Sequence, residues 1–310
     1  MPRASLRMAV VGMKGFLLYH PGSKERAMTE IKTVGVIGAG TMGNGIAHVL
    51  ARSGLRVVLC EVEQRFLDRG LETIRKNLGR EAEKGKISLA DVDETLRLIE
   101  GTLDRGALAE ADLIVEAATE KFEVKRAIFE DLDSIARPEV ILASNTSSIS
   151  ITKLAAVTGR PERVIGMHFF NPVPVMKLVE VIRGLQTSQE TYETVATLAE
   201  KLGKTAVEVN DAPGFVSNRV LMPLLNEAMF AVMEGVATPD AVDEVFRLGM
   251  AHPMGPLTLA DFIGLDVCLD IMRVLHEGLG DPKYRPCPLL VRMVDAGWLG
   301  RKSGRGFYSY

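Results

Sequence analysis

A glycine-rich segment directly after a short apolar run constrains the fold of this chain more than any other feature. Residues 34–43 read VGVIGAGTMG, in which Gly38, Gly40 and Gly43 have the spacing G-x-G-x-x-G. The pattern is typical of a buried parallel strand, a tight turn and a helix. The first glycine permits the turn, the second lets a pyrophosphate approach the backbone, and the third lets helix and strand pack closely. We therefore expect a Rossmann-type dinucleotide site.

An acidic residue follows at the distance that such a site requires. Thr41 and Met42 stand where the expected helix begins, so its first amide groups face the cofactor phosphates. The next apolar run, 56–60, ends at Glu61, 18 residues after Gly43. A carboxylate there accepts hydrogen bonds from the adenosine ribose and repels a 2′-phosphate. We expect NAD as the cofactor; NADP is the less favoured alternative, which the nearby Arg65 would help to bind.

Apolar strand-like runs alternate with helical stretches over the first two thirds of the chain. Strands are expected at 112–116, 140–143, 163–167, 177–182 and 205–209, and helices at 42–53, 64–86 and 121–136. After Asp211 the pattern becomes helical, at 214–234, 238–248 and about 257–277, with a further helix after Pro288. Alternating strands and helices indicate βαβ units. The predicted fold class is α/β, a Rossmann-type, mostly parallel sheet domain at 28–210 followed by an all-helical domain at 211–310.

The composition is that of an ordinary globular protein, with 47% hydrophobic residues, 25% charged residues and a net charge of −3. This near-neutral charge gives no indication of nucleic-acid binding. No apolar run approaches the ~20 residues that a membrane span needs. Cys60, Cys268 and Cys287 lack the spacing of a metal site or disulfide set. We expect reduced thiols, no metal, no membrane partner and a cytoplasmic location.

The first 27 residues are basic, with five Lys or Arg residues against Glu25 alone. They could form a transit peptide. We favour a leader or an upstream extension without ordered structure, because Met28 leads straight into the first strand and has the position of a natural start.

Two stretches place chemically useful side chains after strands, where ligands bind in a doubly wound sheet. Residues 144–148 read SNTSS, whose hydroxyls either touch a ligand or cap the helix expected at 151–157. His168 follows strand 163–167, and Glu180 lies on or near the next strand. If these strands form a hairpin, the carboxylate can orient the imidazole and stabilise its protonated form. From the residues alone, a catalytic and a structural histidine are equally good interpretations.

Residues from about 31 to 310 resemble the L-3-hydroxyacyl-CoA dehydrogenases, and among them the bacterial 3-hydroxybutyryl-CoA dehydrogenases. The likeness rests on long ordered stretches: VIGAGTMGNGIA at 36–47, VEAATEKFEVK at 115–125, ASNTSSISI at 143–151, GMHFFNPVPVMKLVEV at 166–181, DAPGFVSNRVLMPLLNEA at 211–228 and GRKSGRGFY at 300–308.

This resemblance implies a role for each matching residue. His168 would be the general base that takes the 3-hydroxyl proton, with Glu180 as its partner. Ser147 would bind the substrate oxygen and touch the cofactor, and Asn218 would help to hold the oxyanion. The residues implied near the cofactor, beyond the glycine-rich loop and Glu61, are Glu120, Lys125, Asn171 and, less directly, Lys302. The implied reaction is the reversible NAD-dependent oxidation of a (3S)-3-hydroxyacyl-CoA.

The partners follow from the same likeness. Helix 64–86 carries seven basic residues, some of which would meet the phosphates of coenzyme A, although interspersed glutamates also fit a solvated face. Relatives form dimers through the helical domain, so we expect a homodimer. The alternatives are a dehydrogenase of a free hydroxy acid or sugar acid in the same superfamily, and a non-catalytic NAD-binding module. Acyl chain length and physiological direction are not encoded in these motifs.

Overall fold

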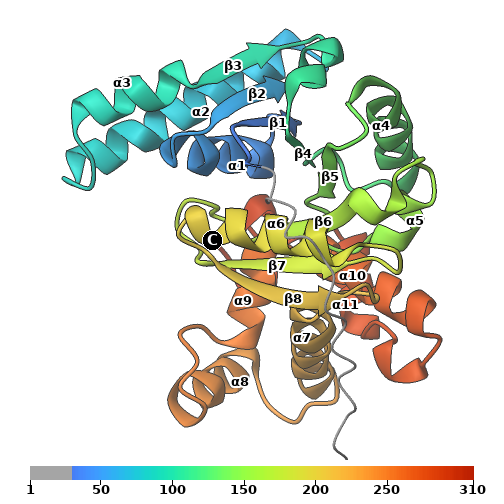
Figure 1. Ribbon diagram of the computed structural model, residues 1–310. Helices are drawn as coiled ribbons and strands as arrows, with labels where there is room; N and C mark the ends of the chain where they lie inside the picture. Colours follow the sequence, from blue (N-terminus) through green and yellow to red (C-terminus); the bar gives the residue numbers. More distant parts are fainter. Residues whose placement is uncertain (1–29) are drawn as a thin grey trace, which may run out of the picture.

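The computed structural model describes residues 30–310 and has an eight-stranded sheet at its centre (Figure 1). The leader expected at 1–27 and the start expected at Met28 lie outside these residues. The strand order is β3-β2-β1-β4-β5-β6-β7-β8. The strands are β1 (Thr33–Ile37), β2 (Arg56–Cys60), β3 (Ile99–Thr102), β4 (Leu113–Glu116), β5 (Ile141–Ser144), β6 (Val164–Phe169), β7 (Leu178–Arg183) and β8 (Thr205–Asn210).

Six strands run parallel, and the direction reverses once, between β6 and β7. The last pair, β7 and β8, is again parallel. The β6–β7 hairpin sets His168 directly opposite Glu180. The sequence-based α/β class with a mostly parallel sheet is therefore confirmed, and the reversal is what brings the histidine and the carboxylate together.

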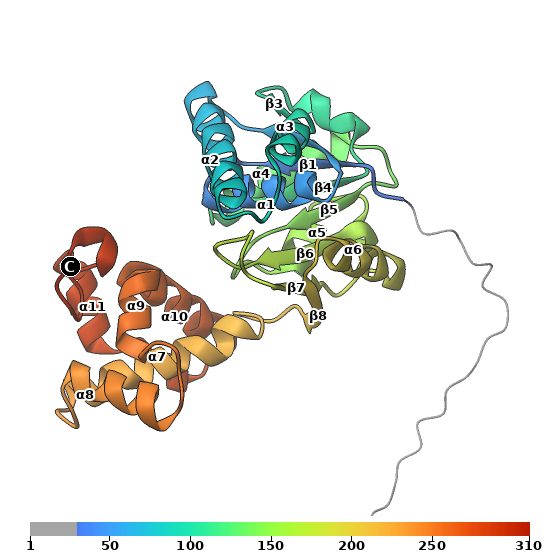
Figure 2. The ribbon, with the colours of Figure 1, turned by 90° about the vertical axis from the view of Figure 1, so that its left-hand side faces the viewer.

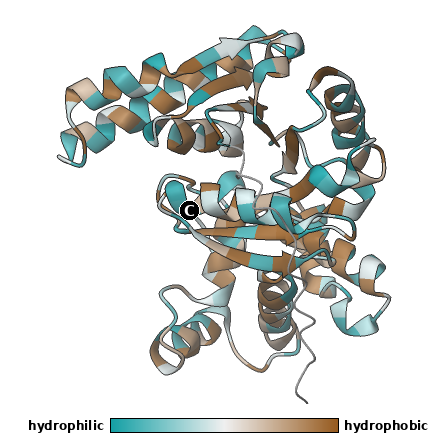
Figure 3. Ribbon diagram, in the orientation of Figure 1, coloured by the Kyte–Doolittle hydropathy of each residue, from teal (hydrophilic) through white to brown (hydrophobic). Residues whose placement is uncertain are grey.

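Helices cover both faces of the sheet, because its buried strands are apolar on each side. One hydrophobic cluster joins the sheet to α1 (Thr41–Arg52), α2 (Gln64–Glu83), α3 (Leu89–Arg97) and α6 (Gln189–Lys201). A second cluster lies on the opposite face, under α4 (Phe122–Ile135) and α5 (Ile151–Ala155). Figure 3 shows the central strands as predominantly hydrophobic, whereas α2 and α3 are mixed.

The C-terminal domain is helical and has its own hydrophobic core (Figure 2). It contains α7 (Ser217–Met233), α8 (Pro239–Glu244), α9 (Pro256–Ile263), α10 (Leu265–Leu279) and α11 (Pro288–Asp295). Thr238 caps α8 through its side chain, as its place before Pro239 predicts. None of the helices in residues 30–310 combines the length and apolar character needed to cross a bilayer.

Three of the expected helices are present but differ from the expectation in continuity, type or end point. The single helix expected at 257–277 is two helices, because Gly264 takes φ +106° and its position is hemmed in by the Lys302 side chain. The helix expected at 238–248 is α8 followed by a π-helical turn, Val245–Gly249. The helix expected at 64–86 ends at Glu83, where Gly85 takes a left-handed φ of +66°.

Candidate active site

The glycine-rich loop has a separate structural reason for each of its glycines. Gly38 takes φ +93° and lies against the Ala117 backbone, 2.8 Å from the carbonyl oxygen to the position of a Cβ. A Cβ on Gly43 would overlap the carbonyl oxygen of Gly38. Around Gly40, by contrast, no heavy atom of residues 30–310 other than those of the adjacent residues in the chain lies within 4 Å of the Cβ position. The loop is therefore closed on the strand side and open at Gly40, where a ligand can approach the backbone.

The amino end of α1 faces this opening. Within Thr41–Arg52 and its N-cap Gly40, no side chain caps the helix and the first turn holds no acidic residue. First-turn amides have no acceptor inside a helix, and the helix dipole adds partial positive charge there. This end of α1 is thus free to bind an anion such as a pyrophosphate.

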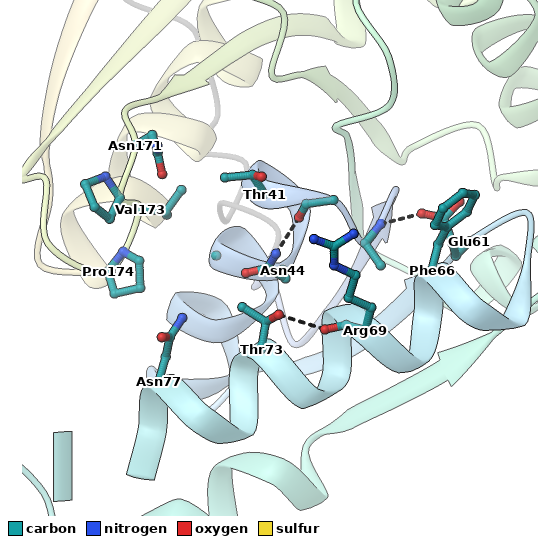
Figure 4. A pocket seen from close by; sticks show the side chains of 14 residues that line it. Thr41, Asn44, Glu61, Phe66, Arg69, Thr73, Asn77, Asn171, Val173 and Pro174 are labelled. Carbon is teal, nitrogen blue, oxygen red and sulfur yellow. Dashed lines mark hydrogen bonds between the residues drawn. The ribbon is translucent and has the colours of Figure 1, made fainter. Parts of the chain in front are cut away.

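A cavity of about 460 Å³ opens beside this helix end (Figure 4). Gly40 is among its lining residues. Thr41 and Asn44 lie at its floor, and the loop 171–174 forms one side. The opposite side is α2, which contributes Phe66, Arg69, Thr73 and Asn77. Helix α2 and the 171–174 loop therefore enclose a groove that starts at the glycine-rich loop.

Glu61 directly follows β2 and points its carboxylate at the glycine-rich loop. Oε2 accepts a hydrogen bond from the Ala39 amide at 2.8 Å, and Oε1 accepts one from Val62 at 2.7 Å. A second cavity, of about 320 Å³, adjoins Glu61 between the ends of β1, β2 and β4. Its walls include Ile37, Val62 and Ile128. An apolar cavity beside a carboxylate fits an adenine ring with its ribose, so the loop, helix end and cavity together fit a dinucleotide.

His168 and Glu180 meet inside the sheet rather than at its edge. His168 lies within β6, not after the strand as expected, since β6 extends to Phe169. Its Nδ1 is 2.8 Å from Oε2 of Glu180, and both residues are buried. The rings of Phe170 and Phe215 flank the imidazole, at centroid distances of 4.7 and 5.9 Å. An imidazole held by one nitrogen in an apolar wall can offer the other nitrogen to a ligand.

The first turn of α7 reaches this pair from the helical domain. The Ser217 amide donates to Oε1 of Glu180 and the Ser217 hydroxyl donates to Oε2, both at 2.9 Å. Burial alone raises the pKa of Glu180, but the hydrogen bonds from His168 and Ser217 outweigh it and hold this pKa below its ordinary value. Glu180 therefore stays ionised near neutral pH.

Glu120 holds the loop that carries Ser147. Its Oε1 accepts hydrogen bonds from the amides of Ser147 and Ser148, at 2.9 and 3.1 Å, and from the Thr146 hydroxyl at 2.5 Å. Burial raises the pKa of Glu120, but the Lys125 charge and these donors outweigh it, so the pKa lies below its ordinary value. The capping alternative, in which Ser148 or Ser150 starts the next helix, holds for Ser150, whose side chain caps α5.

Lys125 belongs to a buried ion pair behind this loop. Its ammonium lies 2.7 Å from Glu116 and 3.4 Å from Glu120. Glu116, fully buried at the end of β4, also accepts a hydrogen bond from the Ser144 hydroxyl at 2.6 Å. The ends of β4 and β5 are thus tied together, which fixes the Ser147 loop relative to the glycine-rich loop.

Two of the expected residues lie away from this centre. Asn171 follows β6 and lines the cavity of Figure 4. Lys302 lies in the C-terminal tail, paired with Asp266, and within residues 30–310 it does not line either cavity. Conversely, Glu116 and Ser217 were missed. Glu116 stands at the end of an apolar run and Ser217 directly precedes Asn218, so both positions were noticeable in the sequence. Neither position reveals the residue that it contacts, which is Lys125 for Glu116 and Glu180 for Ser217.

Comparisons with known proteins agree with this geometry. Residues 33–212 match the family profile of the 3-hydroxyacyl-CoA dehydrogenase NAD binding domain, and residues 214–310 match its C-terminal domain. A probable 3-hydroxybutyryl-CoA dehydrogenase of Bacillus subtilis is 60% identical, over 91% of this chain and 98% of its own length. The probable enzyme of the same name in Deinococcus radiodurans is 62% identical, over 89% of this chain and 99% of its own.

Among solved structures, the (S)-3-hydroxybutyryl-CoA dehydrogenase of Ralstonia eutropha superposes with a TM-score of 0.89 at 52% identity. The match covers 91% of this chain and 99% of that one. The resemblance seen in the motifs is confirmed, as is NAD as the cofactor. The chain belongs to the 3-hydroxyacyl-CoA dehydrogenase family of NAD-dependent oxidoreductases.

Proposed function

We propose that this enzyme catalyses the reversible oxidation of a (3S)-3-hydroxyacyl-CoA, with 3-hydroxybutyryl-CoA as the main substrate, to the 3-oxoacyl-CoA. The observation that carries the proposal is the buried His168–Glu180 pair, which Ser217 joins to the first turn of α7, where the next residue, Asn218, contacts Ser147. The names of the relatives support the substrate class. When bound, NAD accepts the hydride that leaves C3 of the substrate.

His168 acts as the general base. With Nδ1–H donating to Glu180, the neutral imidazole keeps an unprotonated Nε2 that can take the proton of the 3-hydroxyl. The ionised Glu180 fixes this tautomer and stabilises the imidazolium that forms. In the reverse direction the same imidazolium returns the proton to the 3-oxo oxygen.

Ser147 and Asn218 hold the substrate oxygen. They are adjacent, because the Asn218 side chain donates to the Ser147 carbonyl at 3.0 Å. A hydroxyl and an amide are neutral donors, which stabilise charge on the oxygen without competing for its proton. Since Ser147 belongs to the sheet domain and Asn218 to α7, we propose that the reaction takes place where the two domains meet.

We propose that coenzyme A occupies the part of the Figure 4 cavity next to α2. Thr73 and Asn77 offer hydrogen bonds there, and Arg69 adds a positive charge. The pyrophosphate of NAD would lie at the opposite end, at Gly40 and Thr41. Of the seven basic residues expected on helix 64–86, Arg69 is the one that lines this cavity. We therefore propose Arg69 as the basic residue that meets coenzyme A.

We also propose that the helical domain, from residue 211 on, forms a homodimer. Several large apolar side chains of this domain are exposed, among them Val216, Val220, Val245, Leu248, Met250 and Phe262. Three of them, Val245, Leu248 and Met250, fall within one short segment, and exposed apolar side chains that gather in this way are characteristic of subunit interfaces. Analytical ultracentrifugation of the full chain tests the proposal, which predicts a dimer, whereas a monomer at micromolar concentration would contradict it.

Steady-state rates with NADH test the function directly. Acetoacetyl-CoA, longer 3-oxoacyl-CoA thioesters and free acetoacetate are the substrates to compare. We expect the highest kcat/KM with acetoacetyl-CoA and a much lower value with free acetoacetate. Turnover of the free acid with none of the thioester would identify a hydroxy-acid dehydrogenase, and no turnover of either would indicate a non-catalytic NAD-binding module.

A further inference from the structure

The Glu180 carboxylate has a second partner besides His168, and this partner comes from another domain. Oε2 faces both His168 Nδ1, at 2.8 Å, and the Ser217 hydroxyl, at 2.9 Å. Oε1 accepts from the Ser217 amide at 2.9 Å. Serine and histidine therefore share one oxygen of a buried carboxylate.

The carboxylate also serves as the cap of α7. The residue at the N-cap position is Val216, and within the described helix α7 no side chain of its own caps the first turn. The Ser217 amide is one of the first-turn donors that lack an intrahelical acceptor. Glu180 supplies that acceptor from β7, and an anion at a helix amino end is favoured by the helix dipole. The start of α7 is thereby held in place on the histidine–carboxylate pair.

We propose that Ser217 is a positioning residue, which reduces the basicity of Glu180 through its hydroxyl and so sets the pH at which His168 gains its proton. The proposal rests on the function proposed above, in which His168 is the general base. Each donor to the carboxylate delocalises its negative charge, and the carboxylate then attracts the imidazolium less strongly. The Ser217 hydroxyl donates to Oε2, the oxygen that faces the imidazole, so it weakens this attraction most directly.

Other charged groups near the pair are directed elsewhere. On β7 and β8, Arg183 pairs with Glu208 at 3.0 Å. On α7, Arg219 lies over the ring of Tyr284, 6.0 Å from its centroid. Behind the Ser147 loop, Glu120 accepts hydrogen bonds from backbone amides and lies 3.4 Å from the Lys125 ammonium. The residue paired with Glu180 on β8 is the uncharged Val207. Ser217 is thus the group that can be changed without altering a charge beside the imidazole.

The test is a set of matched single substitutions. Ser217→Ala removes the hydroxyl but keeps the hydrogen bond from the backbone amide to Oε1 of Glu180. Ser217→Thr restores a hydroxyl. Ser150→Ala is the matched control, because Ser150 also donates its hydroxyl to a carboxylate, that of Asp211, at 2.7 Å. If the hydroxyl acted only on stability, Ser217→Ala and Ser150→Ala would have similar effects on every readout.

The main readout is the titration of the His168 ring by NMR in protein labelled with ¹³C at histidine Cε1. The chain has five histidines, so the His168 signal is assigned by its absence in His168→Gln. We expect Ser217→Ala to raise the titration midpoint of this signal by about 0.5 pH unit. The midpoint in the pH profile of kcat/KM for oxidation should move by the same amount. Ser217→Thr should restore the wild-type midpoint, and Ser150→Ala should leave it unchanged.

The outcomes separate this inference from the proposed function. An unchanged or lowered midpoint in Ser217→Ala, in an enzyme that still reduces acetoacetyl-CoA, would overturn the role of Ser217 alone. A wild-type protein that turns over no 3-oxoacyl-CoA would overturn the function itself, whatever the NMR midpoints.

Discussion

The side-chain amide of Asn218 donates a hydrogen bond to the backbone carbonyl of Ser147, at 3.0 Å. The two residues are 71 positions apart in the chain and belong to different domains. Together with the two bonds from Ser217 to Glu180, this contact attaches the first turn of α7 to both sides of the candidate site. The candidate site is therefore formed by residues of both domains, at the place where they contact each other.

Loss of the Asn218 amide should mainly affect the chemical step. We expect Asn218→Ala to lower kcat about 100-fold, the usual cost of removing one donor to an oxyanion. The neighbouring Arg219→Ala is the control, because Arg219 faces Tyr284, and its kcat should stay near that of the wild type. Equal losses in the two variants would mean that Asn218 acts only through the fold of α7.

The glycine-rich loop predicts opposite defects for two similar substitutions. Gly43→Ala should lower the melting temperature, because the added Cβ overlaps the Gly38 carbonyl. Gly40→Ala should melt like the wild type, since its Cβ has open space, yet bind NADH at least about tenfold more weakly because the methyl occupies room for the pyrophosphate. Thermal unfolding and NADH fluorescence titration measure the two effects. A Gly40→Ala variant with normal NADH affinity would place the pyrophosphate elsewhere.

Glu61 should decide between the two nicotinamide cofactors. We expect Glu61→Ala to reduce the ratio of kcat/KM with NAD to that with NADP at least about tenfold, because a carboxylate repels a 2′-phosphate. Both cofactors should also bind more weakly, an effect that leaves the ratio unchanged, because the Ala39 amide loses its acceptor. Glu94→Ala, which removes an exposed carboxylate of α3 away from both cavities, serves as the control. An unchanged ratio in Glu61→Ala would show that the ribose is recognised by other residues.

His48 should make the protein sensitive to mild acid. Burial, assisted by the charges of Arg52 and Lys204, lowers the pKa of His48 to about 4. Between its ordinary value near 6.5 and this value, the unfolded chain binds more protons than the folded one, so stability falls as the pH falls. We expect the free energy of unfolding to drop by at most about 2 kcal/mol from pH 7 to pH 5 on this account, because the Glu81 carboxylate, 3.3 Å from Nε2 of His48, favours the protonated ring and opposes the shift.

Urea unfolding at these two pH values, with and without substitution, measures the effect. His48→Gln should remove most of the drop, whereas His252→Gln should not, because His252 is exposed. A drop of the same size in wild type and His48→Gln would assign the acid sensitivity to other groups.

Local patterns predicted much of the fold because they depend on neighbouring residues. The order of strands and helices around the glycine-rich loop followed from apolar runs and turn residues. The sequence indicated that Glu180 could orient His168 if their two strands formed a hairpin, and the structure has this hairpin. The break at Gly264 was not foreseen, since the apolar spacing continues across it and the glycine is required by packing against the C-terminal tail. Helices α3 and α6 and the edge strand β3 were not identified either.

The candidate site was predictable only in part, for a related reason. Residue types and the family likeness indicated His168, Glu180, Ser147 and Asn218. The ion pair of Glu116 with Lys125 depends on how α4 packs against the end of β4, which no local pattern encodes. Similarly, Ser217 is an ordinary helix residue until the position of α7 relative to β7 is known.

The role of His168 as general base is the central claim, and the turnover of His168→Gln tests it most directly. Glutamine keeps a polar side chain of similar reach but cannot accept the proton from the 3-hydroxyl near neutral pH. We expect kcat for acetoacetyl-CoA reduction and for 3-hydroxybutyryl-CoA oxidation to fall at least about 100-fold. The dissociation constant for NADH, measured on the same preparation, should change less than about twofold, because His168 lines neither cofactor cavity. A variant that binds NADH normally and keeps most of its kcat would contradict the account.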